Sequence, residues 1–301
     1  MNNGFFEQVR VFELIARTRS LTAAAAQLQT TQSTVSRLLA ALETTMSSQL
    51  VRRSTRALTL TEQGEAFLPK AIRLLQAGEA AASSLAATDS NYSGRLRVSC
   101  SHSFARLVLL PALADWQYEN PKLHLELFPS DQIEPIVSKG IDLAIRFGPL
   151  SDSSLVAKRI GRCDLFVVAS RDYVDRKNRP SWPRQLREHD CLVLAGRGRP
   201  RPWTFKAADE SVSVSVSGRL SLSTFDGIRS AVLADLGIAI TPAYFWKEEL
   251  ANGKVVRLLE NWEVQALPIH AVSPTRPDPK GKEVAFTAFV ERTLAKYCEA
   301  L

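Results

Sequence analysis

The sequence predicts an α/β protein built in three parts: a small helical N-terminal domain, one long helix, and a larger region of two α/β lobes. Three observations lead to this prediction. Apolar residues recur at helical spacing through residues 1–60, they form a heptad pattern over residues 61–87, and strands alternate with helices after Gly94. The chain has 301 residues, about twice the usual length of one domain, which agrees with several folded units.

The N-terminal domain is expected to contain three helices. Phe5, Val9, Phe12 and Ala16 share one face of the first helix. Ser20 supplies an N-cap oxygen for the second helix, whose four consecutive alanines favour very close packing against a neighbour. The third helix is expected to begin at a cap on residue 30 or 31, to end near residue 45, and to bury Val35, Leu38, Leu39 and Leu42.

The outer face of the third helix is polar and is followed by a basic hairpin. The polar residues of this helix start are Thr31, Gln32, Ser33, Thr34, Ser36 and Arg37. The hairpin candidate, residues 50–60, carries Arg52, Arg53 and Arg56 near its tip. Residues 1–63 hold seven Arg and no Lys against four Glu, a net charge of +3 that suits nucleic acid.

This order of elements is that of a winged helix-turn-helix, in which the second helix of the motif enters the major groove and the wing touches phosphate. The Gln32 amide can bond adenine in a bidentate manner, and Arg37 can reach guanine or phosphate. The short hydroxyl side chains allow close approach to the backbone and base edges. Arg53 and Arg56 are expected to bind phosphate, whereas Arg52 is equally compatible with pairing to an acidic neighbour. If the helix is considered alone, the alternative to DNA binding is that its polar face is simply exposed to solvent.

The long helix is expected to pair with a second chain. Its apolar seam alternates steps of four and three residues, as in a coiled coil, through Phe67, Ala71, Leu74, Gly78, Ala81 and Leu85. Pro69 is expected to bend its early turns. A single helix would leave this stripe in water. Residues 88–94 form a polar, hinge-like linker.

After Gly94 the pattern predicts nine strands and several helices arranged in two lobes with largely parallel sheets. The expected helices are Ala105–Glu119, Thr224–Asp235 and a final helix over residues 282–300 that packs on the first lobe. The expected strands are residues 95–100, 123–128, 142–147, 165–169, 191–195, 212–216, 238–241, 254–258 and 267–272.

Two loops that follow strands and open helices are candidate ligand sites. Residues 99–104 and 221–226 are both rich in Ser and Thr. Their hydroxyls and free backbone N–H groups could hold a carboxylate from opposite sides, with Phe104, Phe147 and Phe225 covering an apolar body. Ordinary helix capping explains each loop equally well when it is considered alone.

Ordered motifs along the chain resemble the LysR-type transcriptional regulators. In the N-terminal part these are Ser20-Leu-Thr-x-Ala-Ala-x-x-Leu28, Gln32-x-x-Val-Ser-Arg37 and Leu58-Thr-Leu-Thr-x-x-Gly64. In the C-terminal part they are Pro121-x-Leu-x-Leu-x-Leu127, Gly140-Ile-Asp-Leu-Ala-Ile-Arg146 and Leu236-Gly-Ile-Ala-Ile-x-Pro242. The resemblance covers essentially the whole chain. The sequence departs from it at Met46-Ser47, where a Leu-Gly turn is common.

The resemblance implies a winged helix-turn-helix over residues 1–63, a linker helix and hinge over 64–92, and a periplasmic-binding-protein-like effector domain over 93–301. Lobe I would comprise about 93–163 and 269–301, and lobe II about 164–268. The implied function is a sequence-specific transcription regulator controlled by a small molecule bound between the lobes. The two Ser- and Thr-rich loops favour a small carboxylate as this molecule. Ser101, Ser103 and Thr224 would bind this effector, with His102 and Phe147 as walls.

The resemblance also implies partners: operator or promoter DNA, a second copy through the linker helix, a homotetramer through the effector domains, and RNA polymerase as a further contact. No catalytic residues, cofactor, metal or membrane are expected. The four cysteines and four histidines are scattered, without disulfide or metal-ligand spacing. The acidic N-terminus and short apolar runs favour a soluble, reduced, cytoplasmic protein.

The alternative is an α/β enzyme or solute-binding protein with an incidental helical extension. The sequence contains neither a Gly-rich phosphate loop nor a Gly-x-Ser-x-Gly elbow. The net charge of +7, from 38 basic and 31 acidic residues, favours a polyanionic partner.

Overall fold

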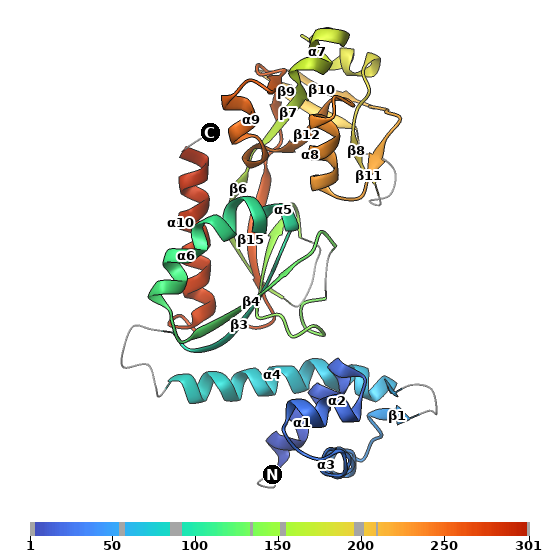
Figure 1. Cartoon of the computed structure of the whole chain (residues 1–301), viewed down its shortest axis with the longest axis vertical. Coiled ribbons are helices and arrows are strands. Elements are labelled where there is room, and N and C mark those ends of the chain that lie inside the picture. The colour runs from blue at the N-terminus through green and yellow to red at the C-terminus, as the bar shows by residue number, and fades with distance from the viewer. Residues whose placement is uncertain are drawn as a thin grey trace. The chain divides into compact units, whose positions relative to one another are not determined.

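The computed structural model describes residues 4–53, 58–84, 92–132, 135–150, 155–195, 202–208 and 210–299. The chain divides into two compact units (Figure 1). One is built mainly from the first 95 residues, and the other contains most of the remainder.

The N-terminal unit begins with three helices that match the sequence prediction. They are α1 (Phe5–Thr18), α2 (Leu21–Gln27) and α3 (Gln32–Thr45). The Ser20 hydroxyl accepts a hydrogen bond from the Ala23 N–H at 3.2 Å, and the Thr31 hydroxyl accepts one from the Thr34 N–H at 3.2 Å. These caps satisfy N–H groups that the helices leave unpaired, so each helix begins where its cap residue stands.

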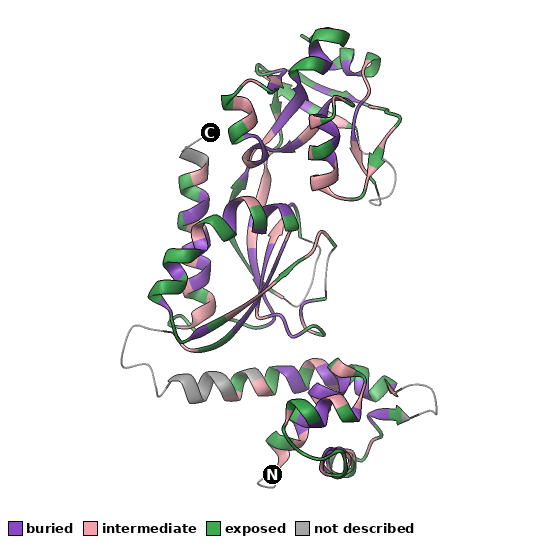
Figure 2. Cartoon of the chain, viewed as in Figure 1, coloured by how far each residue is buried: buried purple, intermediate pink, exposed green. Residues whose placement is uncertain are grey.

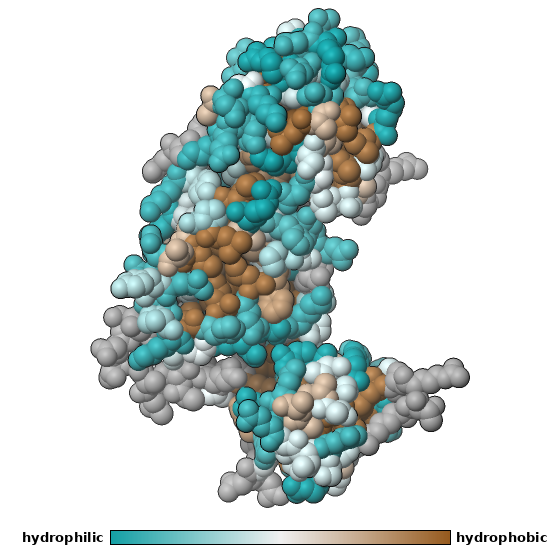
Figure 3. Space-filling view, viewed as in Figure 1, coloured by the Kyte–Doolittle hydropathy of each residue, from teal (hydrophilic) through white to brown (hydrophobic). Residues whose placement is uncertain are grey.

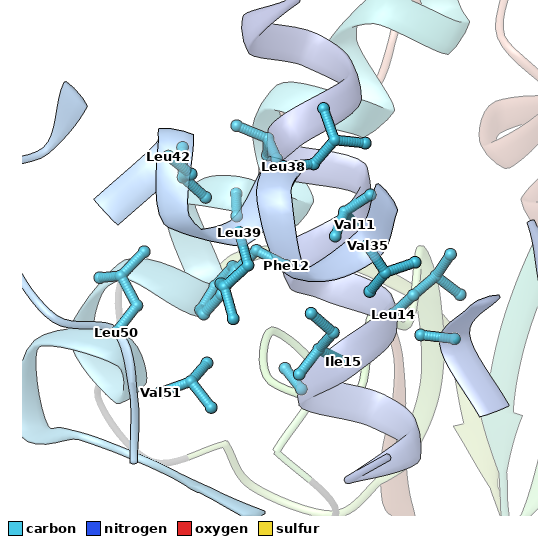
Figure 4. Close-up of a cluster of buried hydrophobic side chains, with 14 of the residues drawn as sticks. Val11, Phe12, Leu14, Ile15, Val35, Leu38, Leu39, Leu42, Leu50 and Val51 are labelled. Carbon is cyan, nitrogen blue, oxygen red and sulfur yellow. The ribbon is translucent and has the colours of Figure 1, made fainter. Parts of the chain in front are cut away.

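One apolar core joins these helices to the hairpin that follows (Figure 4). Phe12 and Ile15 of α1 and Val35 and Leu42 of α3 are fully buried. Ala24 is fully buried as well, as expected if α2 approaches its neighbours closely. The core therefore fixes which face of α3 remains outside.

The predicted hairpin is present as β1 (Val51–Arg53) paired in antiparallel fashion with β2 (Leu58–Leu60). Residues 54–57, including Arg56, lie outside the described residues. The side chain of Arg53 lies outside them as well.

The long helix is α4 (Glu62–Ser84), with Pro69 inside it. Its apolar seam is not simply exposed, because Ala71 is buried and the Phe67 ring lies 5.4 Å from the Phe12 ring. The first turns of α4 therefore cover the chain's own core, and this corrects the expectation that the whole stripe faces water. Leu74 remains 39% exposed. Residues 85–91 and the side chain of Ala81 lie outside the described part of the chain.

The first lobe of the larger unit contains a five-stranded sheet in the order β4-β3-β5-β15-β6. The strands are β3 (Gly94–Cys100), β4 (Leu123–Pro129), β5 (Leu143–Phe147), β6 (Val156–Cys163) and β15 (Leu267–Ser273). Strands β3 and β5 are parallel, but β15 runs antiparallel to both β5 and β6. The chain leaves this lobe along β6 and returns along β15, so the expectation of largely parallel sheets was wrong.

Helices cover one side of this sheet (Figure 1). A continuous helical segment comprises α5 (His102–Phe104), the π-helical turn η1 (Ala105–Leu109) and α6 (Leu110–Glu119), and α10 (Lys282–Glu299) packs beside it. Trp116 of α6 lies edge-on to Phe286 of α10, with ring centroids 5.1 Å apart. The final helix therefore packs on the first lobe, as predicted.

The second lobe holds three smaller sheets. Strand β7 (Leu165–Ser170) lies between β12 (Ala239–Pro242) and β13 (Val255–Leu258), antiparallel to both. Strand β8 (Val193–Leu194) pairs in parallel with β11 (Ser221–Leu222), and β9 (Trp203–Ala207) lies between β10 (Glu210–Val214) and β14 (Glu263–Val264). The helices of this lobe are α7 (Arg171–Lys177), η2 (Pro183–Glu188), α8 (Phe225–Leu233), η3 (Ala243–Phe245) and α9 (Lys247–Ala251).

Figure 2 shows buried residues of both lobes on their strands and on their helices. Strand β6 escaped prediction because its first four residues are exposed and include Lys158 and Arg159. It lies at the edge of its sheet, where charged side chains discourage pairing with other chains.

No helix among the described residues is long and apolar enough to cross a membrane.

Candidate functional site

The start of α3 presents the polar residues that the sequence singled out. Thr31, Gln32, Ser33 and Arg37 are exposed, and Thr34 and Ser36 are half-buried. Since Val35, Leu38, Leu39 and Leu42 bury one side of α3, the exposed Gln32, Ser33 and Arg37 of its first two turns lie away from the core. An exposed polar helix start of this kind suits insertion into a DNA groove.

Hydroxyl groups at this helix start are held by one another. The Thr31 hydroxyl lies 2.8 Å from the Ser33 hydroxyl and 2.9 Å from the Thr34 hydroxyl. The Thr22 hydroxyl donates to Gln32 Oε1 at 3.3 Å, which orients the Gln32 amide from α2. These hydrogen bonds partly order the polar side chains before binding, so less side-chain entropy is lost when they bind a partner.

The hairpin is anchored to α3 through Glu43. Its Oε1 accepts hydrogen bonds from the N–H groups of Leu50 at 2.8 Å and Val51 at 3.1 Å. The Thr61 hydroxyl donates to the Gln49 carbonyl at 2.6 Å and accepts from the Gly64 N–H at 3.0 Å. These bonds fix the start of β1, and hence the strand that ends at Arg53, relative to the helix.

The first candidate effector loop lies at the start of α5. The Ser101 hydroxyl caps this turn by accepting from the Phe104 N–H at 3.4 Å, His102 is exposed, and Ser103 is buried. Ser101 therefore acts as a helix cap, which is the alternative expected from the sequence. Its hydroxyl proton can still be donated to another acceptor.

The second candidate loop lies at the start of α8. The Thr224 hydroxyl accepts from the Gly227 N–H at 3.0 Å, which is again a helix cap. Asp226 in the first turn forms an ion pair with Arg106, which follows the first loop by two positions. This pair joins the helix starts of the two candidate loops across the two lobes.

Tyr244 of η3 completes this region and was not predicted. Its hydroxyl lies 3.3 Å from the Ser103 hydroxyl. Its ring centroid lies 6.3 Å from that of Phe104 and 6.4 Å from that of Phe147, and the Phe104 and Phe147 rings are 5.2 Å apart. Tyr244 follows the Leu236–Pro242 motif by two residues, but only the fold brings it to a loop 141 positions earlier.

Asp131 is a second residue that sequence reasoning missed. Its Oδ1 accepts from the His102 N–H at 3.2 Å and lies 3.8 Å from His102 Nδ1. One of the backbone donors expected to face a carboxylate effector is therefore bonded to a carboxylate of the chain itself.

Two family models together match most of the chain. A model described as "Bacterial regulatory helix-turn-helix protein, lysR family" matches residues 6–65, and one described as "LysR substrate binding domain" matches residues 89–295. The curated regulator PtxR of Pseudomonas aeruginosa is 29% identical over 291 residues, covering 97% of this chain and 92% of that protein.

Solved structures agree with these matches. CrgA, a LysR-type transcriptional regulator from Neisseria meningitidis, aligns with a TM-score of 0.60 at 27% identity, covering 97% of this chain and 99% of that one. The full-length Vibrio cholerae virulence activator AphB aligns with a TM-score of 0.59 at 26% identity, covering 96% of this chain and 98% of that one.

Proposed function

Because the chain belongs to the LysR family of transcriptional regulators, we propose that it recognises its operator with the first turns of α3 and responds to a small carboxylate bound between its two lobes. The family and the relatives are transcriptional regulators rather than enzymes. A regulator that reads bacterial DNA acts in the cytoplasm, which is the compartment we propose. The domain boundaries at residues 63 and 92 belong to the same proposal.

The observation that carries the DNA proposal is the outward set of polar side chains at the start of α3. Gln32 and Arg37 are exposed there, and the hydroxyls of Thr31, Ser33, Thr34 and Ser36 lie on the same two turns. We assign base contacts to Gln32 and Arg37, backbone contacts to the hydroxyls, and phosphate contacts to Arg53 and Arg56.

This assignment is tested by titrating the full chain with its own upstream DNA at several stated salt concentrations. Arg37→Ala should weaken binding by about 1–3 kcal/mol and relax base preference at one position of the operator, because a base contact is lost. Arg53→Ala should weaken binding to all sequences alike and reduce the salt slope by about one, as expected for a phosphate contact.

Arg10→Ala is the matched control, because Arg10 is an exposed arginine of α1 in the same domain and its loss removes the same charge. It should change operator affinity little. Equal losses for Arg10→Ala and Arg37→Ala would mean that net charge, rather than the α3 face, determines binding.

The effector proposal places a carboxylate against Ser101, Ser103 and Thr224, with His102 and Phe147 as walls. Its support is chemical: hydroxyls at two helix starts, and apolar rings beside them. The Arg106–Asp226 ion pair links the two loops, so a ligand that binds both would alter how the lobes meet.

For the assembly we propose a homodimer through α4 and a homotetramer through the effector domains, with RNA polymerase as a further partner. Exposed Phe6 and Leu74 support pairing through α4, since both are large apolar side chains of the N-terminal unit. Figure 3 shows apolar side chains on the face of the first lobe where α6 lies. Leu110 is 51% exposed there, which supports a second contact.

A further inference from the structure

At the place where the effector is proposed to bind, each lobe places an apolar side chain against the other lobe. Tyr244 of the second lobe extends to the Phe104 and Phe147 rings of the first lobe. In return, Leu107 of the first lobe packs against the core of the second. The phenol ring therefore occupies the space that an aromatic ligand would need if it were held by Ser103.

The polar atoms of this place are bonded within the chain as well. The buried Ser103 hydroxyl lies within hydrogen-bond distance of the Tyr244 hydroxyl, and Asp131 holds the His102 N–H. Burial raises the pKa of Tyr244, although hydrogen bonds with Ser103 and Ser101 lower it in part. The phenol thus stays protonated and neutral at physiological pH.

The contacts of Tyr244 resemble those that a small aromatic ligand makes in a binding site. A flat ring meets aromatic walls, and one oxygen on that ring meets the hydroxyl of a buried serine. Few groups in the chain resemble a small aromatic compound so closely, because the tyrosine side chain is p-cresol with one bond to the backbone. Whatever replaces it must satisfy the same ring contacts and the same buried hydroxyl, which is costly to leave unpaired.

We propose that Tyr244 is an internal ligand of the effector site, and that the effector is an aromatic compound whose hydroxyl or carboxylate oxygen replaces the Tyr244 hydroxyl at Ser103. This inference rests on the proposed function, since it specifies the ligand class of the same site. Binding then requires Tyr244 to leave the Phe104 and Phe147 rings, and η3 must move with it. Replacement of Tyr244 by the effector thus changes the contacts between the two lobes.

The test is to remove the internal ligand and to supply it from solution. Purified full-length Tyr244→Ala is titrated by calorimetry with p-cresol and with toluene, which has the same ring but lacks the hydroxyl. We expect p-cresol to bind at least about tenfold more tightly than toluene, because one buried hydrogen bond distinguishes them. We also expect p-cresol to restore the melting temperature that the substitution lowers.

Two further variants serve as controls. In Tyr244→Ala with Ser103→Ala, the preference for p-cresol should disappear, because its partner hydroxyl is gone. In Tyr118→Ala, which removes an 89% exposed tyrosine, p-cresol should bind more weakly than in Tyr244→Ala, because Tyr244 still competes for the site. Equal binding of p-cresol and toluene by Tyr244→Ala, or no binding by the folded variant, would overturn the proposal.

If Tyr244→Ala does not fold, Tyr244→Phe decides the matter. It keeps the ring and removes only the bond to Ser103, so amide hydrogen exchange over residues 102–109 should quicken about tenfold, while Tyr118→Phe leaves it unchanged. Unchanged exchange in Tyr244→Phe would contradict the proposal. Neither measurement uses DNA, so failure here is separate from failure of the Arg37 and Arg53 tests.

Discussion

Ser47 adopts a left-handed backbone conformation, with φ of 49°, at the turn between α3 and the hairpin. It stands where the family commonly has glycine, and a Cβ in this region costs about 1–2 kcal/mol. Ser47→Gly should therefore stabilise the N-terminal unit by about 0.5–1 kcal/mol, after subtraction of the extra entropy that glycine loses. Thermal or urea unfolding of the chain measures this change.

Ser48→Gly is the matched control, because Ser48 is the next residue and does not have a positive φ. There the substitution adds chain entropy without relieving strain, so it should destabilise by about 0.5–1 kcal/mol. The same sign for both variants would mean that strain at Ser47 is not significant.

Gly64 in the first turns of α4 lies against the hairpin so closely that no side chain fits. A Cβ there would lie 2.1 Å from the Leu50 carbonyl oxygen. Gly64→Ala should therefore displace β1 from α4 and destabilise the N-terminal unit by at least about 1–3 kcal/mol. Because β1 leads to Arg53, the operator affinity should fall as well, which a DNA titration measures.

Gly4→Ala is the control for this prediction, since its Cβ would meet only Gln8 Nε2 at 3.6 Å. It should leave both stability and DNA affinity near those of the unmodified chain. Unchanged DNA affinity in a folded Gly64→Ala variant would show that the hairpin does not need this position.

The elements of the N-terminal unit could be predicted from the sequence because their signals are local. Ser20 and Thr31 lie within three residues of the N–H groups that they cap, and Val35 and Leu42 lie on one helical face. The candidate effector loops were found for the same reason, since Ser101 and Thr224 precede helices. Tyr244 and Asp131 were missed because strands β12 and β4 bring them to these loops from distant parts of the chain.

At the scale of the whole molecule, the dimer proposal depends on the part of the α4 seam that the chain does not cover. Phe6 packs over Gly78 so closely that a Cβ at Gly78 would lie 2.4 Å from its ring, yet Phe6 and Leu74 remain exposed. Leu74→Glu should place a charge in the interface and shift dimers to monomers by sedimentation, with helix content retained. Arg73→Glu changes the charge of the neighbouring exposed position by more and should leave the dimer intact. A Leu74→Glu dimer of unchanged affinity would move the interface elsewhere.

Effector and DNA affinities must be coupled reciprocally if the two lobes report ligand binding to α3. Thr224→Val keeps the shape of the side chain and removes its hydroxyl, so it should weaken the binding of aromatic carboxylates such as benzoate and blunt their effect on operator affinity. DNA affinity without ligand should be unchanged.

Because the same hydroxyl caps α8, the Thr224→Val variant also loses about 1 kcal/mol of stability. Ser170→Ala removes the equivalent cap of α7, where the Ser170 hydroxyl accepts from the Tyr173 N–H at 3.2 Å, and should cost similar stability without changing ligand affinity. Equal ligand affinity in Thr224→Val and the unmodified chain, or binding by neutral or cationic compounds alone, would refute Thr224 as a carboxylate donor.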